Sequence, residues 1–172
     1  MKTLAFCLLL GSLGAAFAMD RVAAQTAPAT GAQLVTLGTA GGPLPRANRA
    51  QSSNLLVVNG ALYLIDAGGS VTSRIVQSGH DFRKVGKIFI THPHSDHTAG
   101  LATLMVSQWE YQRAEPTDIY GGGVEALVKG ALAYLTPNAE IRWAEGKKRP
   151  MAETLRATTS QLASSIRMPT LR

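Results

Sequence analysis

The chain has 172 residues, a single cysteine and a formal net charge of +6. The charge is unevenly placed, because residues 19–141 carry nine basic and nine acidic side chains, whereas residues 142–172 carry seven basic and two acidic ones. The body is therefore neutral and lacks the basic surface typical of nucleic-acid binding. A scaffold of disulfides is also excluded, because Cys7 has no second cysteine to pair with.

The first 24 residues have the layout of a secretory signal peptide. Lys2 precedes an almost wholly apolar run over residues 4–13, an Ala-x-Ala cleavage signal ends at Ala18, and Val22-Ala23-Ala24 is a second candidate. The run is too short to span a membrane, and a buried N-terminal helix is the alternative interpretation. We expect cleavage after one of these alanines, a periplasmic or secreted location, and no membrane contact afterwards.

Strands and helices alternate along the body of the chain. We expect strands near residues 33–37, 54–58, 61–65, 84–92 and 117–121, and helices near residues 70–78, 98–112 and 123–135. Asn59-Gly60 predicts a tight hairpin turn, because both residue types tolerate positive φ. The alternation favours an α/β fold with a layered sheet. After Ile141 the pattern fades, and only a weak helix near 151–166 is indicated.

The segment "ITHPHSDHTAG" at residues 90–100 contains three of the four histidines and an aspartate. It follows an apolar strand and precedes a helix. On an extended backbone His92 and His94 point the same way, and Asp96 and His97 then lie where the helix begins. Imidazole and carboxylate groups suit zinc, and also iron or manganese. The alternative is a polar loop in which a histidine caps the helix.

The pattern T-H-x-H-x-D-H-x-x-G, with "LYLIDAGG" before it, resembles the metallo-β-lactamase-fold hydrolases. The stretch "LGTAGGPLPRANRAQSSNLLV" is similar to the opening of the ribonuclease Z-like and arylsulfatase-like branch of that family. The resemblance covers roughly residues 33–141. It implies the N-terminal half of an αββα sandwich, with a site for two metal ions between the sheets.

The resemblance also implies roles for individual residues. His92 and His94 would bind one metal ion, and Asp96 and His97 would bind the second, with Asp96 also the candidate catalytic residue. Asp66 would lie beside the site and orient the ligands, although it also suits a plain turn before two glycines. The expected cofactor is a pair of zinc ions, with manganese or iron as alternatives.

The rest of the family's ligands, two histidines and a bridging aspartate, are expected downstream of the motif. This chain has no histidine after His97, and Asp118 is its only later aspartate. We therefore expect half of the sandwich to be missing and the chain to be a truncated or frame-shifted product. Its parts would be a signal and processing region (1–24), a half-domain (33–141) and a basic, poorly patterned tail (142–172).

The expected function is that of an exported hydrolase that attacks an ester, sulfate or phosphodiester bond of a small molecule with metal-bound hydroxide. A non-catalytic metal-binding remnant is the alternative. Arg46 and Arg49 are candidate contacts for an anionic substrate, with solvated loop arginines as the alternative. Export and a neutral body predict no nucleic-acid partner. An exposed apolar sheet face favours aggregation or a homodimer.

Overall fold

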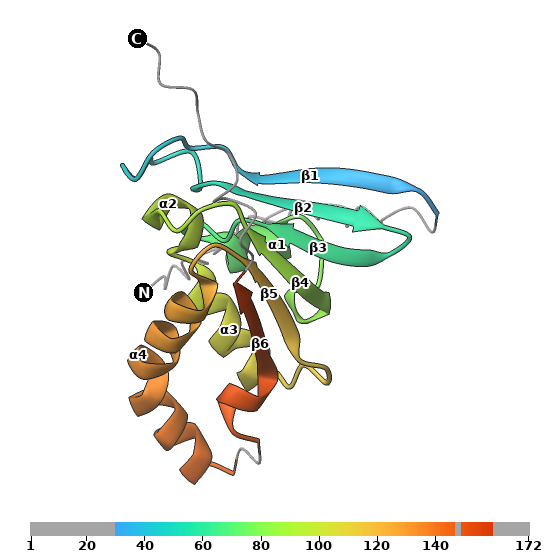
Figure 1. The fold of residues 1–172 in the computed structure, drawn as a ribbon. Helices are drawn as coiled ribbons and strands as arrows, with labels where there is room; N and C mark the ends of the chain where they lie inside the picture. Colours follow the sequence, from blue (N-terminus) through green and yellow to red (C-terminus); the bar gives the residue numbers. More distant parts are fainter. Residues whose placement is uncertain (1–29, 147–148, 160–172) are drawn as a thin grey trace, which may run out of the picture.

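The computed structural model describes residues 30–146 and 149–159, so the predicted signal peptide lies outside the described residues. The strands are β1 (Ala32–Gly38), β2 (Ser53–Val58), β3 (Ala61–Ile65), β4 (Val85–Ile90), β5 (Thr117–Gly121) and β6 (Leu155–Thr159) (Figure 1). The helices are α1 (Val71–Gln77), α2 (Ser95–Thr98), α3 (Leu101–Glu110) and α4 (Val124–Ala144), with 3-10 turns η1 (Phe82–Lys84) and η2 (Met151–Thr154). The expected α/β class is confirmed.

The six strands form one sheet in which the spatial order follows the chain order, β1 to β6. The first three strands pair antiparallel, and β3 to β6 run parallel to one another. The turn between β2 and β3 has Asn59 at φ 47° and Gly60 at φ 81°. Both values lie in the left-handed region that a type I′ hairpin requires, so this predicted hairpin is confirmed.

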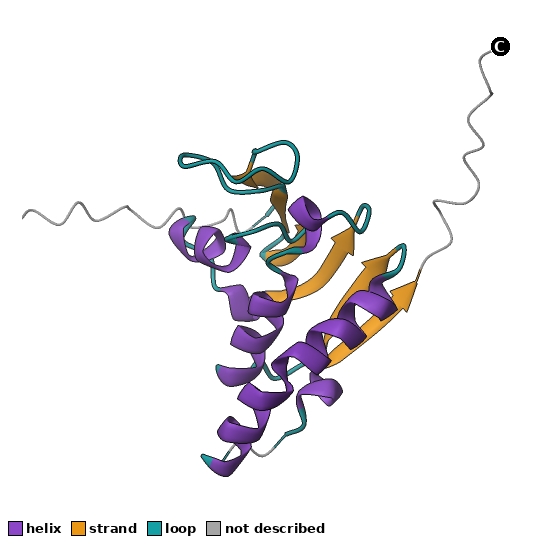
Figure 2. Cartoon of the chain, turned by 90° about the vertical axis from the view of Figure 1, so that its left-hand side faces the viewer, coloured by secondary structure: helices purple, strands orange, loops and turns teal. Residues whose placement is uncertain are grey.

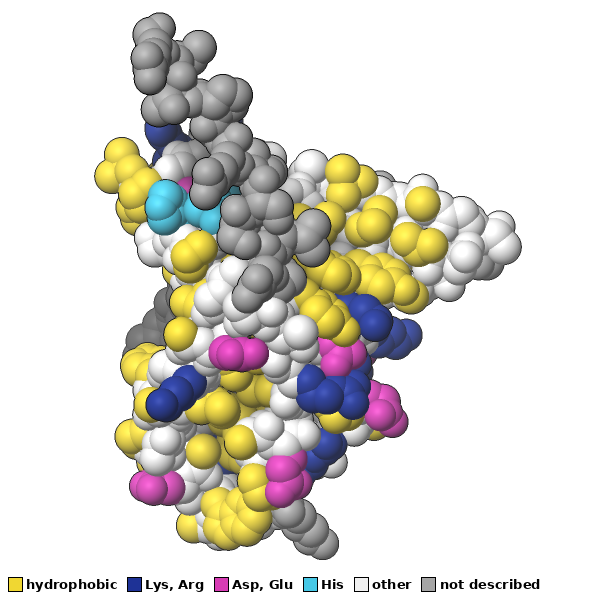
Figure 3. Space-filling view, viewed as in Figure 1, with side chains coloured by type: hydrophobic (Ala, Val, Ile, Leu, Met, Phe, Trp, Pro, Cys, Tyr) yellow, Lys and Arg dark blue, Asp and Glu magenta, His cyan; other side chains and the backbone are white. Residues whose placement is uncertain are grey.

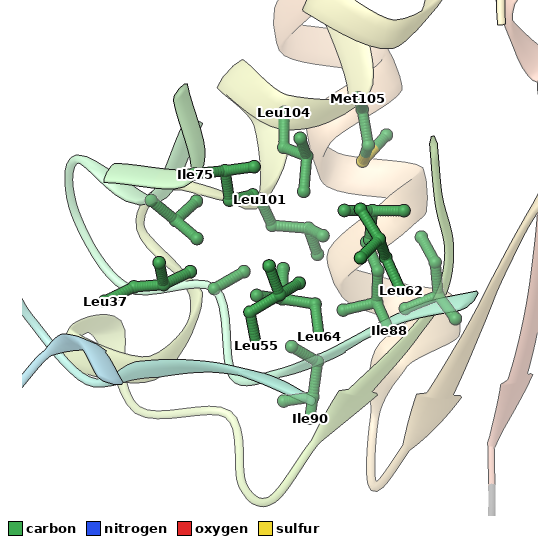
Figure 4. Close-up of a cluster of buried hydrophobic side chains, with 14 of the residues drawn as sticks. Leu37, Leu55, Leu62, Leu64, Ile75, Ile88, Ile90, Leu101, Leu104 and Met105 are labelled. Carbon is green, nitrogen blue, oxygen red and sulfur yellow. The ribbon is translucent and has the colours of Figure 1, made fainter. Parts of the chain in front are cut away.

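The helices lie together on one side of the sheet, as Figure 2 shows. The strand residues that point toward them form the core with apolar residues of α1 and α3 (Figure 4). The largest fully buried apolar side chains of this core include Leu55, Leu64, Ile75, Ile88, Leu104, Met105 and Ile119. Complete burial of such a side chain contributes roughly 1.5–3 kcal/mol, so this face contributes strongly to the stability of the fold.

The opposite side of the sheet, here called the open face, is also apolar. It consists of Leu34, Leu56, Val58, Tyr63, Ile65, Phe89 and Tyr120, which occupy paired positions on neighbouring strands. Five of these side chains line a shallow hollow of about 490 Å³ to which only strand residues contribute. Leu34 is 60% exposed and Phe89 is 40% exposed. Figure 3 shows hydrophobic side chains along the strands on the right of the molecule.

The regular structure continues beyond Ile141, where the sequence pattern fades. Helix α4 extends to Ala144, and β6 adds a parallel strand beside β5. The weak helix expected near 151–166 is wrong for residues 155–159, because pairing with the exposed edge of β5 outweighs local helix propensity. Within the described ranges, no helix has the length and apolar character needed to cross a membrane.

Candidate metal centre

The histidine motif lies at the carboxyl end of β4, where the chain leaves the sheet and enters α2. In α/β sheets this edge is the usual place for a ligand site, because loops from neighbouring strands meet there. His94 occupies the position before the first residue of α2, and Asp96 and His97 lie inside this short helix. The strand-to-helix placement expected for the motif is therefore present.

The three motif histidines and the aspartate form one cluster at the surface, and the histidines appear at the upper left in Figure 3. The His92 ring centroid lies 4.6 Å from that of His94 and 4.1 Å from that of His97. Asp96 is only 5% exposed, and its Oδ2 lies 3.5 Å from Nε2 of His97. The His94 side chain makes no hydrogen bond that caps α2, which counts against the helix-capping alternative.

Asp66 lies directly after β3 and connects that strand to the motif. It has a φ of 61°, a left-handed value that aspartate tolerates better than most residues, and it is 4% exposed. Its carboxylate accepts hydrogen bonds from the backbone N–H of Thr91 (2.8 Å), from the Thr91 hydroxyl (2.9 Å) and from Nδ1 of His97 (2.7 Å). Asp66 thus has more than the role of a plain turn residue.

The contact with Asp66 determines which nitrogen of His97 is free. An ionised carboxylate only accepts hydrogen bonds, so Nδ1 of His97 must carry the proton. In the neutral ring Nε2 then has an available lone pair, and this is the atom that faces Asp96. A carboxylate behind a histidine in this way is the usual support of a metal-binding imidazole.

The turn after β3 packs directly against the motif backbone. The N–H of Ala67 donates to the carbonyl of His97 (2.7 Å), and the N–H of Gly100 donates to the carbonyl of Ala67 (2.8 Å). A side chain at Gly68 would collide with the carbonyl oxygen of Asp96, and one at Gly100 would collide with that of Gly68. These two glycines therefore permit the close approach that holds Asp66 against the cluster.

The donor groups fit a zinc-type ion in their chemistry and spacing. Zinc binds imidazole nitrogen and carboxylate oxygen at about 2.0–2.2 Å, so tetrahedral geometry separates neighbouring donor atoms by about 3.4 Å. The His97 Nε2 to Asp96 Oδ2 distance of 3.5 Å agrees with two donors to one ion. Their number is smaller than a complete site needs, because no three His, Cys, Asp or Glu side chains in the described part of the chain are arranged around a single ion position.

None of the other candidate residues makes a hydrogen bond or ion pair with the cluster in the described part of the chain. The imidazole of His80 contacts the hydroxyl of Ser78 at 3.0 Å, beyond the end of α1. Arg46 and Arg49 are exposed on the loop between β1 and β2. Asp118 pairs with Arg156 at 2.6 Å, and this hydrogen bond raises the pKa of the guanidinium. The motif residues and Asp66 are therefore in contact with one another, whereas these others make no hydrogen bond or ion pair with them among the described residues.

Two polar contacts were not anticipated from the sequence. The side chain of Gln51 accepts from the N–H of Gly69 (3.0 Å) and donates to the carbonyl of Pro43 (3.1 Å), which ties the β1–β2 loop to the turn beside the site. Nothing in the local sequence indicates this contact. The hydroxyl of Thr91 contacts both Asp66 and His92, and its position immediately before the first motif histidine is the one available signal.

Residues 32–128 match the family model described as the anti-Pycsar protein Apyc1. Ribonuclease Z of Clostridium botulinum strain Alaska E43 is 37% identical over 98 residues, which are 56% of this chain and 31% of that protein. The chain thus spans about a third of the length of this curated relative.

Solved structures show the same arrangement of elements. The short form of human tRNase Z superposes with a TM-score of 0.55 at 24% identity, over 73% of this chain and 44% of the human chain. The metallo-β-lactamase-fold protein YhfI from Bacillus subtilis superposes with a TM-score of 0.53 at 20% identity, over 76% of this chain and 45% of YhfI. At these identities the likeness establishes the fold alone.

The prediction that nucleic acid is excluded as a partner is wrong. The curated relative is by its name a ribonuclease, an enzyme that acts on RNA. The physical error lies in counting only side-chain charges, because bound metal ions are often the largest local charges in a site and attract phosphate without a basic protein surface. The neutral balance of residues 19–141 therefore carries no weight against an RNA substrate.

Proposed function

The chain belongs to the family of the anti-Pycsar protein Apyc1, within the metallo-β-lactamase fold, and on that basis we propose that it acts in metal-dependent hydrolysis of phosphodiester bonds. The resemblance to this hydrolase fold and to ribonuclease Z, expected from the sequence, is confirmed at the family level. The observation that supports the proposal most strongly is the cluster of three imidazoles and a carboxylate at the end of β4, with Asp66 behind it.

In this proposal the protein holds two metal ions. His92 and His94 are ligands of one, and Asp96 and His97 are ligands of the other. When bound, zinc-type ions lower the pKa of water and neutralise negative charge on a phosphate group. Asp66 keeps Nε2 of His97 available for coordination, and the burial of Asp96 holds its carboxylate in one position.

The described residues also set an expectation for the rate. A catalytic zinc ion normally has three protein ligands and one water, and here each ion receives two ligands from the motif. The chain by itself is therefore expected to bind metal weakly and to turn over more slowly than about one per second, a low value for an enzyme. A metal-binding protein without catalysis is the alternative that the assay must separate.

The substrate class in this proposal is a phosphodiester, with RNA as the first candidate. The support is the ribonuclease Z relative, which is 37% identical over 98 residues. Sulfate esters, expected from the arylsulfatase-like opening of the sequence, serve as the comparison substrate. Preference for the phosphodiester over the aryl sulfate is the expected result.

Metal binding tests the proposal most directly. Zinc content and zinc affinity are measured on the purified full chain, on the double variant His92→Ala/His94→Ala, and on His80→Ala as the matched control. We expect the double variant to lose most of the bound zinc and the control to keep it, because His80 lies outside the cluster. Unchanged zinc content in the double variant would remove the basis of the proposal.

Activity is the second arm of this experiment. The same three proteins are assayed on bis(p-nitrophenyl) phosphate, a single-stranded RNA and an aryl sulfate, with added zinc or manganese and with a chelator. Phosphodiester cleavage that the chelator abolishes and that His92→Ala/His94→Ala lacks supports a hydrolase. Stoichiometric zinc binding without cleavage of any substrate favours the non-catalytic alternative.

Export belongs to the proposal as well, and it rests on the signal-like layout of residues 1–24 alone. N-terminal sequencing of the protein from the periplasm or medium should then begin at Met19 or Gln25. A product that retains Met1 and stays inside the cell would contradict this part of the proposal.

A further inference from the structure

The hydroxyl of Thr91 lies between the buried carboxylate and a motif histidine on the other proposed ion. Its Oγ1 is 2.9 Å and 3.0 Å from the two oxygens of Asp66, and 3.1 Å from Nδ1 of His92. Nδ1 of His97 is farther away, at 3.5 Å, and has its own shorter contact with Asp66. Thr91 is thus in hydrogen-bond contact with Asp66 and with His92 at the same time.

The direction of these hydrogen bonds follows from the number of protons. A threonine hydroxyl has one proton to donate and two lone pairs with which to accept. The carboxylate of Asp66 is the stronger and closer acceptor, because a hydrogen bond to a charged oxygen is roughly twice as strong as one between neutral groups. The hydroxyl therefore donates to Asp66 and accepts from His92, which places the proton of the neutral His92 ring on Nδ1.

We propose that Thr91 is a positioning residue. Through its hydroxyl, Asp66 also determines which ring nitrogen of His92 carries the proton. Asp66 holds the proton of His97 on Nδ1 directly, and Thr91 holds that of His92 on Nδ1 indirectly. One buried carboxylate thereby leaves Nε2 free on two histidines that the proposed function, on which this inference rests, assigns to two different metal ions.

The third motif histidine provides an internal comparison. His94 is exposed, and among the described residues its imidazole has a ring contact with His92 but no hydrogen bond to a carboxylate or hydroxyl. Its tautomer is therefore set by solvent, which leaves the proton mainly on Nε2. The inference predicts that His92 and His97 share one tautomer and that His94 differs from them.

The tautomers are measured without metal, by long-range ¹H–¹⁵N correlation spectra of the histidine rings in the full chain at about pH 8.5. The spectra are recorded above the ordinary imidazole pKa of about 6.5, because only a neutral ring has a tautomer to assign. The variants are Thr91→Val, which removes the hydroxyl, and Thr91→Ser, which keeps it. Thr98→Val is the matched control, because the Thr98 hydroxyl contacts a backbone carbonyl in the same motif and no ring nitrogen.

We expect Nδ1–H for His92 in the unmodified protein, in Thr91→Ser and in Thr98→Val, and a shift toward Nε2–H in Thr91→Val. His97 should keep Nδ1–H in all four proteins, because its bond to Asp66 remains. Zinc affinity should fall by about tenfold or more in Thr91→Val, the usual effect of removing a group that supports a ligand, and should recover in Thr91→Ser.

Two results would overturn the inference. One is Nε2–H on His92 in the unmodified protein, a result that does not depend on whether Thr91→Val folds. The other is an unchanged His92 tautomer in a folded Thr91→Val protein. Neither result bears on metal binding itself, whereas a failure of the proposed function would appear as absent zinc binding with the His92 tautomer as expected.

Discussion

The two faces of the sheet differ in what covers them although both are apolar. Ile88 and Phe89 are neighbours on β4, and their side chains point to opposite faces. Ile88 is fully buried under the helices, whereas Phe89 is 40% exposed and stacks on Tyr120 with ring centroids 5.4 Å apart. Strands that are apolar on both faces are typical of sheets covered on both sides. Burial here is thus determined by which layer of the fold is present beside a face, and residue type alone does not predict it.

A substitution on the face covered by the helices is expected to have the largest effect on the free energy of unfolding. Ile88→Ala should lower the free energy of unfolding by about 3 kcal/mol, because it removes a fully buried side chain from a packed core and leaves a cavity. Urea unfolding followed by circular dichroism measures this change. A loss below about 1 kcal/mol would mean that the core collapses around the deletion and that the helix layer is less tightly packed than the structure indicates.

A smaller effect is expected one residue away on the open face. Phe89→Ala should lower the free energy of unfolding by no more than about 1 kcal/mol. The side chain is already partly in water, so the substitution removes mainly its contact with Tyr120. Phe89→Lys should also raise solubility by reducing the exposed apolar area. A loss as large as that of Ile88→Ala would show that another layer covers this face in solution, and the contrast between the faces would disappear.

The smallest effect concerns a surface contact that belongs to neither face. Asp81 is the N-cap residue of η1, where its carboxylate accepts from the N–H of Arg83 (2.9 Å) and forms an ion pair with the same residue (2.7 Å). The Arg83 hydrogen bond lowers the pKa of Asp81. The contribution of Asp81 to the stability of the folded protein is therefore fully present above the ordinary aspartate pKa of about 3.9. It is lost as the pH falls through the lower pKa that Asp81 has in the folded protein.

Asp81→Asn measures this contribution. At neutral pH the variant should be less stable than the unmodified protein by less than about 1 kcal/mol, because exposed ion pairs and caps contribute little. The difference should shrink toward zero in acid. A difference that grows as the pH falls would show that the pKa of Asp81 is not lowered in the folded protein.

The sequence was sufficient for those parts of the fold that have local signals. The Asn59-Gly60 hairpin needs positive φ at two adjacent residues, and the helices at 71–77 and 101–110 have regular apolar spacing. Strand β6 could not be predicted, because its residues form a strand through pairing with β5. In the site, too, some features have a local signal in the sequence and others depend on tertiary packing. The motif residues are adjacent in the sequence, whereas the contacts of Asp66 and Thr91 depend on packing across 25 residues.

The agreement between strand order and chain order has a consequence for how the protein can assemble. Each strand from β2 onward docks on the edge of the strand made just before it, so the sheet can grow in the direction of synthesis. Asp66 and His97 are separated by 31 positions, and every candidate ligand precedes β5. A nascent chain that has emerged as far as α3 already contains the β2–β3 hairpin, the turn after β3 with Asp66, and the histidine motif. If the chain binds metal as proposed, capture of the ion could therefore accompany translation, before β5 and β6 are made.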